Sequence, residues 1–197
     1  MKNPKEERTY VMVKPDGVKK GLIGEIIKRF EQRDLKIVAL QMFQASLEEV
    51  DGHYPKDEKW IRRLGEKTLA TYEKSGRNID DVEKDFGTTD LAKVGVTVRG
   101  WLITYVASSP MVKMVVQGVH AVDMVRKLVG PTMPSLAEVG TIRGDYSTDS
   151  AISANVEKRA VFNLAHASET PEEAAHEIEY WFGKQPIFTY KRFGVDA

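Results

Sequence analysis

The chain has 197 residues, 42% of them hydrophobic and 29% charged, and its 29 basic and 29 acidic side chains cancel to a formal net charge of zero. This profile predicts one soluble globular domain with room for an insertion, and it excludes a global electrostatic attraction to nucleic acid or anionic membranes. No cysteine is present, which excludes disulfides, thiolate nucleophiles and cysteine-based zinc sites. The polar N-terminus lacks the apolar core of a signal peptide and no apolar run reaches membrane-spanning length, so we expect a cytoplasmic protein.

The chain opens with a strand, a helix and a second strand. Residues 9–13 form a compact β-rich run, and Lys14-Pro15-Asp16-Gly17 ends it with turn chemistry. Apolar residues at helical spacing over 22–30 predict a core-facing helix that ends near Asp34. Residues 36–43 predict a long strand, and their uniform apolar character argues against an exposed edge.

The middle of the chain fits this plan less well. Residues 47–54 predict a short helix and residues 60–72 a longer one, but residues 74–93 are polar and predict a surface excursion. A helical stripe returns over 98–106. Residues 111–117 then predict a third strand, and residues 121–129 a helix that ends at Gly130.

The last third contains a loop-rich segment over 131–155 and a fourth predicted strand over 161–164. Thr170 offers an N-cap for the final helix, with Pro171 at its first position and Glu173 three residues after the cap. His166 therefore lies at a strand-to-helix junction. Such junctions present side chains to ligands, because the strand fixes the backbone while its end leaves the side chain exposed.

This order predicts an α+β fold with a ferredoxin-like βαββαβ core. Two split β-α-β units would build a four-stranded antiparallel sheet with helices on one face. We expect residues 1–197 to form a single domain, with a helical or loop insertion at about 57–97. The fold alone decides nothing about chemistry, because it hosts many functions.

Polar residues that suit phosphate chemistry follow the predicted strands. Lys14, Arg126 and Arg143 come from three different segments and could hold phosphate oxygens while charge moves. The imidazole of His166 could accept a phosphoryl group and pass it on. The sequence has no G-x-x-x-x-G-K-[ST] loop, no G-x-G-x-x-G opening a helix and no close histidine pair at metal spacing, so no metal ligands are predicted.

Each of these residues also has a structural interpretation. A histidine near a strand end is more often a hydrogen-bonded structural residue, and surface arginines often form ion pairs that contribute little. For three other histidines the structural interpretation is the preferred one. These are His53, His120 and His176.

The motifs together carry a resemblance that covers most of the chain from Arg8 to Phe182. Five segments resemble, in the same order, the motifs of nucleoside diphosphate kinases. They are Val13-Lys14-Pro15-Asp16-Gly17, His53-Tyr54, Arg126, Gly140-Thr141-Ile142-Arg143-Gly144-Asp145 and Asn163-Leu164-Ala165-His166-Ala167-Ser168-Glu169.

The resemblance implies a ping-pong enzyme in which a nucleoside triphosphate such as ATP phosphorylates His166 and a nucleoside diphosphate takes the group back. Magnesium would arrive with the nucleotide, and the protein would be a homo-oligomer, a hexamer or a tetramer built from dimers. By the same resemblance, Lys14 and Asn163 would bind the ribose hydroxyls and the bridging phosphate region. The β- and γ-phosphates would be bound by Arg126, Thr132 and Arg143. Tyr54 would lie beside the transferring group, and Ser168 and Glu177 would orient the imidazole.

Two insertions distinguish the chain from a typical family member. About three dozen extra residues lie between Tyr54 and Leu102, and about ten separate Asp145 from Asn163, both longer than ordinary connections. Val98 falls where the family usually stacks a phenylalanine on the nucleobase. Three aromatic residues of the insertion are alternatives for that role: Trp60, Tyr72 and Phe86.

A second hypothesis keeps this fold but makes the chain a catalytically weak nucleotide sensor or scaffold, with the insertion as a partner surface. The sequence favours the enzyme, because a chain without catalysis would be free to lose Lys14, Arg143 or His166 and all three are present.

Overall fold

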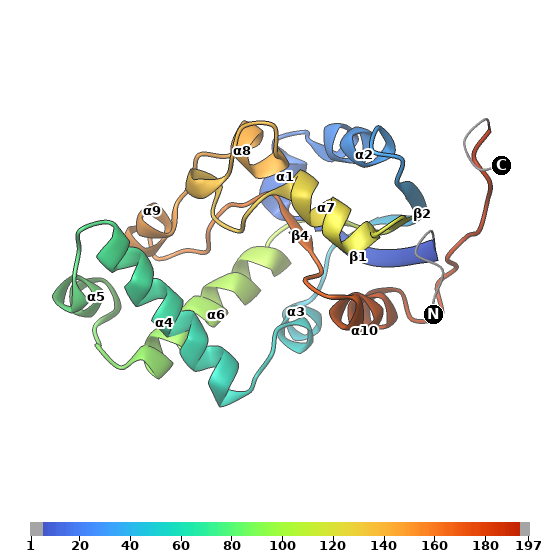
Figure 1. The fold of residues 1–197 in the computed structure, drawn as a ribbon. Coiled ribbons are helices and arrows are strands. Elements are labelled where there is room, and N and C mark those ends of the chain that lie inside the picture. Colours follow the sequence, from blue (N-terminus) through green and yellow to red (C-terminus); the bar gives the residue numbers. More distant parts are fainter. Residues whose placement is uncertain (1–5, 194–197) are drawn as a thin grey trace.

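The computed structural model describes residues 6–193, and its centre is a four-stranded antiparallel sheet (Figure 1). The strands are β1 (Glu7–Val13), β2 (Lys36–Phe43), β3 (Met111–Gly118) and β4 (Ala165–Ala167). Their order β2-β3-β1-β4, with helices between them along the chain, confirms the predicted ferredoxin-like α+β core.

Helices cover both faces of the sheet, so the prediction of helices on one face was wrong. Successive residues of a strand point to opposite faces, and β1 buries Val11 and Val13 in one apolar cluster and Tyr10 and Met12 in another. The first cluster packs under α2 (Ile23–Glu31) and α7 (Ala121–Val129), and the second under α3 (Leu47–His53), α6 (Leu91–Ala107) and α10 (Pro171–Phe182). Two such layers allow an apolar strand to be buried on both sides.

Strand β2 lies at one edge of the sheet, which corrects the expectation that it would not. It pairs only with β3 among residues 6–193, and Leu40 and Met42 are 52% and 57% exposed. The C-terminal segment covers part of this edge, because Phe188 donates a backbone hydrogen bond to Val38. An apolar edge strand of this kind is a surface that other chains can cover.

Strand β4 begins after the segment that the sequence predicted. Residues 161–164 are irregular and Leu164 has a positive φ of 68°. The chain therefore turns at Leu164 and enters the sheet only at Ala165, where His166 pairs with Met12 of β1. Apolar composition identified the buried segment correctly but could not locate this turn.

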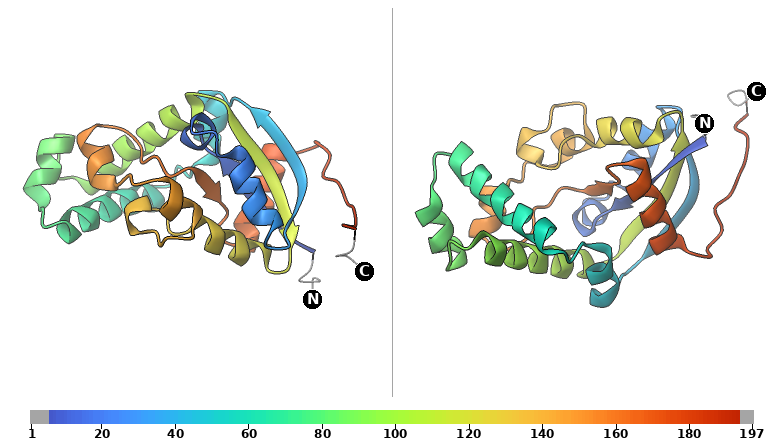
Figure 2. Two further views of the ribbon diagram at one scale, coloured as in Figure 1. Left: turned by 90° about the horizontal axis from the view of Figure 1, so that it is seen from above. Right: turned by 60° about the horizontal axis from the view of Figure 1, so that its bottom comes forward.

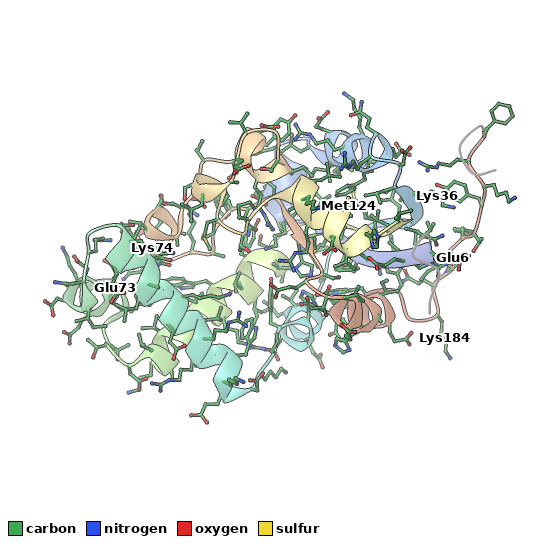
Figure 3. All side chains as sticks on the ribbon, viewed as in Figure 1. Glu6, Lys36, Glu73, Lys74, Met124 and Lys184 are labelled. Carbon is green, nitrogen blue, oxygen red and sulfur yellow. The ribbon has the colours of Figure 1, made fainter. Side chains whose placement is uncertain are left out.

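The insertion forms a helical layer beside the sheet, away from both chain ends (Figures 1 and 2). It contains α4 (Glu58–Lys74), α5 (Ile79–Phe86) and the first half of α6. Residues 74–93 are therefore not only a polar excursion, since Asn78 caps α5 in a capping box and Val82 is buried against Tyr72 and Val94. Exposed Glu73 and Lys74 mark the outer end of α4 (Figure 3).

Helices α4 and α6 pack backbone against backbone. A Cβ at Gly65 would lie 1.9 Å from the carbonyl oxygen of Leu91, and a Cβ at Gly95 would lie 1.9 Å from that of Ile61. Glycine is therefore required at both crossing positions, and the two helices form one rigid wall.

Short helices replace two other predicted irregular segments. The turn at Lys14 starts α1 (Pro15–Lys19), and the loop-rich segment contains η2 (Pro134–Leu136), α8 (Ile142–Tyr146) and α9 (Ala151–Val156). Within residues 6–193, no helix combines the length and apolar character needed to cross a membrane.

Candidate active site

A cavity of about 1070 Å³ lies between the insertion and the segments that follow β3. Helices α4 and α6 contribute one side of it, and α7, η2, α8 and α9 contribute the other. Nine of the ten residues predicted for the site line this cavity: Lys14, Tyr54, Val98, Arg126, Thr132, Arg143, Asn163, His166 and Glu177. The tenth, Ser168, lies behind it, fully buried.

A carboxylate holds the imidazole of His166 from behind. The Nε2 atom of His166 lies 2.7 Å from Oε1 of Glu177, and the Ser168 hydroxyl donates to the other carboxylate oxygen at 2.6 Å. Burial opposes ionisation of Glu177, but its interactions with His166, His53 and Ser168 outweigh the effect of burial and lower the pKa of Glu177. With Nε2 engaged, Nδ1 is the ring nitrogen left for chemistry, and the side chain is 20% exposed.

His53 is a neighbour that the sequence interpretation placed among structural residues. It lines the cavity with its ring centroid 5.1 Å from that of His166, and its Nδ1 accepts a hydrogen bond from the Trp181 indole at 3.2 Å. Burial, reinforced by His166, lowers the pKa of His53 to about 3, so it is neutral at pH 7. Its adjacency to Tyr54 in a matching motif was the available signal.

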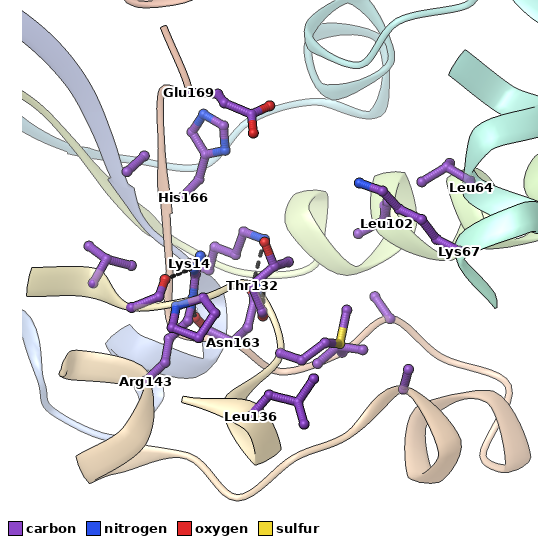
Figure 4. A pocket seen from close by; sticks show the side chains of 18 of the residues that line it. Lys14, Leu64, Lys67, Leu102, Thr132, Leu136, Arg143, Asn163, His166 and Glu169 are labelled. Atoms are coloured by element: carbon purple, nitrogen blue, oxygen red, sulfur yellow. Dashed lines mark hydrogen bonds between the residues drawn. The ribbon is translucent and has the colours of Figure 1, made fainter. Parts of the chain in front are cut away.

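Lys14 is a buried lysine fixed by hydrogen bonding. Its ammonium donates to Oδ1 of Asn163 at 2.9 Å, and the Asn163 amide donates to the backbone carbonyl of Thr132 at 3.0 Å (Figure 4). Burial and the nearby charge of Arg143 lower the pKa of Lys14 to about 8, against the opposing effect of Asp16. These hydrogen bonds hold Lys14, Asn163 and Thr132 in fixed positions relative to one another, although the three residues are distant in sequence.

Asp16 is the anion beneath this network. Its carboxylate accepts hydrogen bonds from the backbone N–H of Leu164, at 3.0 Å, and from the Tyr105 hydroxyl. It therefore ties the loop after β1 both to the turn before β4 and to α6, which fixes the position of Lys14 relative to His166.

Arg143 is committed to three backbone carbonyls. Its guanidinium donates to Asn163 at 3.0 Å, to Gly130 at 2.7 Å and to Ala165. Arginine has five N–H donors, so two remain for a ligand in the cavity. Burial lowers the pKa of Arg143 to about 10, and the group still carries its charge at pH 7.

Arg126 is the third of the predicted cations that line the cavity. It is 43% exposed at its side chain and donates to the backbone carbonyl of Glu169 at 2.7 Å, with the Glu169 carboxylate 3.5 Å away. Both partners are solvent-exposed, so the ion pair is weak and the guanidinium is available to a stronger anion.

The other half of the cavity is mainly apolar. Trp60, Leu64, Val98 and Leu102 line it, from α4 and α6. Of the aromatic alternatives for base stacking, Tyr72 is fully buried in the core of the insertion and Phe86 packs on Trp101 at 5.3 Å. Trp60 alone of the three lines the cavity, and its ring lies 6.2 Å from that of Tyr54.

Three cations from different segments, Lys14, Arg126 and Arg143, therefore line one cavity together with the imidazole of His166. A model of the family described as nucleoside diphosphate kinase matches residues 7–64 and 98–187. The chain belongs to the nucleoside diphosphate kinase family. Residues 65–97, which include most of α4 and all of α5, lie outside the match.

Comparison with individual proteins gives the same family. Proteins named nucleoside diphosphate kinase from Pyrobaculum aerophilum and Thermococcus kodakarensis are 50% identical over 181 residues and 37% identical over 185 residues. The first alignment covers 92% of this chain and 97% of that protein, and the second covers 93% and 81%.

Solved structures share the fold. A crystal structure of an NDP kinase from Pyrobaculum aerophilum has a TM-score of 0.87 and 46% identity, covering 93% of this chain and 100% of that one. A nucleoside diphosphate kinase from Borrelia burgdorferi, solved as a transition state mimic with vanadate and ADP, has a TM-score of 0.74 and 34% identity. That alignment covers 97% of this chain and 95% of the other.

Proposed function

We propose that the chain transfers the γ-phosphoryl group reversibly from a nucleoside triphosphate to a nucleoside diphosphate through a phosphohistidine on His166. The observation that carries the proposal is the bond between His166 Nε2 and Glu177 at 2.7 Å, which leaves Nδ1 facing a cavity lined by Lys14, Arg126 and Arg143. An oriented imidazole beside phosphate-binding cations suits covalent phosphoryl transfer.

The chemistry takes two in-line displacements. The Nδ1 lone pair attacks the γ-phosphorus, a nitrogen–phosphorus bond forms, and the β–γ bridging oxygen leaves with its electron pair on the nucleoside diphosphate. The proton between Nε2 and Glu177 stays in place, and the carboxylate stabilises the imidazole as it becomes positive. A second nucleoside diphosphate then attacks the phosphohistidine by the reverse step.

The surrounding residues bind rather than react. Arg126, Thr132 and Arg143 bind the β- and γ-phosphates, and the two free N–H groups of Arg143 point its charge at the oxygens that gain it. Lys14 and Asn163 bind the ribose hydroxyls and the bridging phosphate region as one hydrogen-bonded unit.

Three further residues complete the arrangement around the transferring group and the base. Tyr54, whose pKa burial raises, stays neutral beside the transferring group. At the far end, Val98 and Trp60 are the side chains offered to the nucleobase.

Magnesium belongs to the substrate in this proposal. His53, His166 and Glu177 bring ligand atoms within 4.8 Å of one another, but this nitrogen-rich set suits a transition metal and not Mg²⁺. A magnesium ion held by phosphate oxygens and water fits the cavity better, and it would neutralise part of the charge of the phosphate chain.

A turnover assay tests the function. ATP is mixed with each common nucleoside diphosphate, and formation of the new triphosphate is followed by chromatography. We expect exchange with every base and ping-pong kinetics. Normal nucleotide affinity without exchange would instead support a sensor or scaffold of the same fold.

We further propose a homo-oligomer, a hexamer or a tetramer of dimers, located in the cytoplasm. The exposed Leu40 and Met42 on edge strand β2 support association, because an edge strand with exposed apolar side chains is a surface that another copy of the chain can cover. Mass measurement in solution decides the number of subunits, and a monomer at micromolar concentration would contradict the proposal.

A further inference from the structure

Helix α4 brings a lysine to the cavity from the part of the chain that the family model does not match. Lys67 lines the cavity and falls within residues 65–97. Its side chain extends from α4 into the cavity, on the side across from His166 and beside Leu102 (Figure 4). The residue is exposed, so a ligand can reach its ammonium group.

No carboxylate among residues 6–193 pairs with the Lys67 ammonium. Within the described residues 6–193 it makes no hydrogen bond and no ion pair, whereas Arg62, on the same helix, pairs with Glu66 at 3.3 Å. A cation aimed into a cavity without a carboxylate partner leaves its charge for a ligand.

The two threonine hydroxyls that α4 turns to the cavity are satisfied within the helix. The Thr68 hydroxyl donates to the carbonyl of Leu64 at 3.0 Å, and the Thr71 hydroxyl donates to that of Lys67 at 2.8 Å. Lys67 is therefore the charged group on this wall that remains able to bind an anion.

The backbone under Lys67 is fixed. Gly65, two residues before it, and Gly95 hold α4 against α6 in backbone contact. Helix α6 is in turn tied to the loop of Lys14 through the Tyr105 hydroxyl and Asp16. Only the side chain of Lys67 has to order itself when a ligand enters, which keeps the entropic cost of the contact small.

Three cations of the opposite wall are held by partners on their own side of the cavity: Lys14, Arg126 and Arg143. Lys127 of α7 lines the same wall. A polyanion bound there would present its outer oxygens toward α4, where Lys67 is the lining cation.

We propose that Lys67 binds the phosphate chain of the nucleotide from the insertion side, so that the chain is held between two walls. The proposal rests on the proposed function, and it assigns the insertion a direct part in substrate binding. Lys67 faces the phosphate chain of the nucleotide across the cavity from His166. It should therefore bind the substrate and the transition state equally well, so its loss should mainly raise KM.

The test replaces Lys67 with methionine, which keeps the apolar stem beside Leu102 and removes the charge. Lys59→Met is the matched control, because Lys59 is an exposed lysine of α4 that does not line the cavity. For Lys67→Met we expect a rise of about tenfold in KM for ATP and for a nucleoside diphosphate, with kcat nearly unchanged. Lys67→Glu should raise KM further, and Lys67→Arg should restore most of the affinity.

Inorganic tripolyphosphate separates a phosphate contact from a nucleoside contact, because it lacks base and ribose. Its dissociation constant, from equilibrium titration, should rise about as much in Lys67→Met as that of ATP, and not in Lys59→Met. Unchanged nucleotide affinity in Lys67→Met, or loss of ATP affinity without loss of tripolyphosphate affinity, would overturn the proposal. Titration needs no turnover, so it decides on Lys67 even if the wild type fails to exchange phosphoryl groups.

Discussion

The two walls of the cavity are built in opposite ways. On the wall of β4, α7 and α8, the polar side chains of Lys14, Arg143 and Asn163 are buried at 5–7% exposure and hydrogen-bonded to one another or to the backbone. On the wall of α4 and α6, the lining is mainly apolar and Lys67 is exposed. The first wall fixes charges before a ligand arrives, and the second is fixed only in its backbone.

Substitutions on the two walls should therefore have different effects. Buried, committed polar groups support the fold and the chemistry together, so their loss should damage both. Residues on the insertion wall should change binding and leave the chemistry intact.

The largest effect is expected for Arg143→Met. Three carbonyl groups lose their donor, so the free energy of unfolding should fall by about 3 kcal/mol and kcat/KM by at least about a hundredfold. Urea unfolding and steady-state kinetics measure both. Arg62→Met is the control, since Arg62 is 61% exposed and its ion pair with Glu66 contributes little. Near-normal activity of Arg143→Met would show that the buried cation is not needed for the chemistry.

Gly95→Ala tests the insertion wall through its backbone. The added methyl group would meet the Ile61 carbonyl, so we expect a loss of about 2 kcal/mol in unfolding free energy and a higher KM with kcat largely retained. Gly100→Ala, on the same helix with no atom within 4 Å of the new Cβ, should stabilise by about 0.5–1 kcal/mol. Equal stabilities for the two variants would show that α4 and α6 do not pack as described.

The pH dependence of kcat/KM should report Lys14. With its pKa near 8, Lys14 loses its charge as pH rises through 8, and binding of the anionic substrate should weaken above that pH. The measured kcat/KM should fall toward the level of Lys14→Met, which should lack this limb. A flat wild-type profile between pH 7 and about 9.5 would assign the charge of this wall to the arginines alone.

The last prediction concerns His53 and the stability of the fold in acid. Its pKa of about 3 lies below the unfolded value near 6.5, so between these values the unfolded chain binds a proton that the native state does not. Its contribution is full above pH 6.5 and is lost as pH falls, by up to about 1.4 kcal/mol per pH unit.

His53→Gln should flatten the acid side of the stability profile between pH 6.5 and about 4.5. His176→Gln, on the exposed side of α10, is the control. Parallel profiles for wild type and His53→Gln would show that His53 titrates normally in the native state.

The sequence predicts the polar wall better than the insertion wall. Lys14, Arg143 and Asn163 lie in short strings whose composition is constrained by both backbone and ligand, so the strings are recognisable. Lys67 lies among exposed charges on α4. Helical spacing puts it on the same face as Trp60 and Leu64, unlike Lys59, but the sequence does not say that this face borders the cavity.

Predictions of the fold were wrong where long-range contacts, and not the local sequence pattern, determine the structure. The helix core and the N-cap at Thr170 were predictable, and the cap is formed by a hydrogen bond from Glu173 N–H to the threonine hydroxyl. The turn at Leu164 was not, because a leucine at positive φ is held there by Asp16 and Lys14, which hydrogen-bond to its backbone from far away in sequence. The edge position of β2 was also not predictable, because its apolar residues indicate burial but do not identify the segment that covers them.

Isolation of the phosphorylated protein tests whether His166 carries the phosphoryl group. The protein is incubated with radiolabelled ATP, and the tryptic peptide covering residues 160–184, which also contains His176, is sequenced by fragmentation. We predict acid-labile, base-stable phosphate on His166, discharged by added nucleoside diphosphate and absent from His166→Asn. An active wild-type enzyme with no such label, or with the label on another residue, would contradict the account.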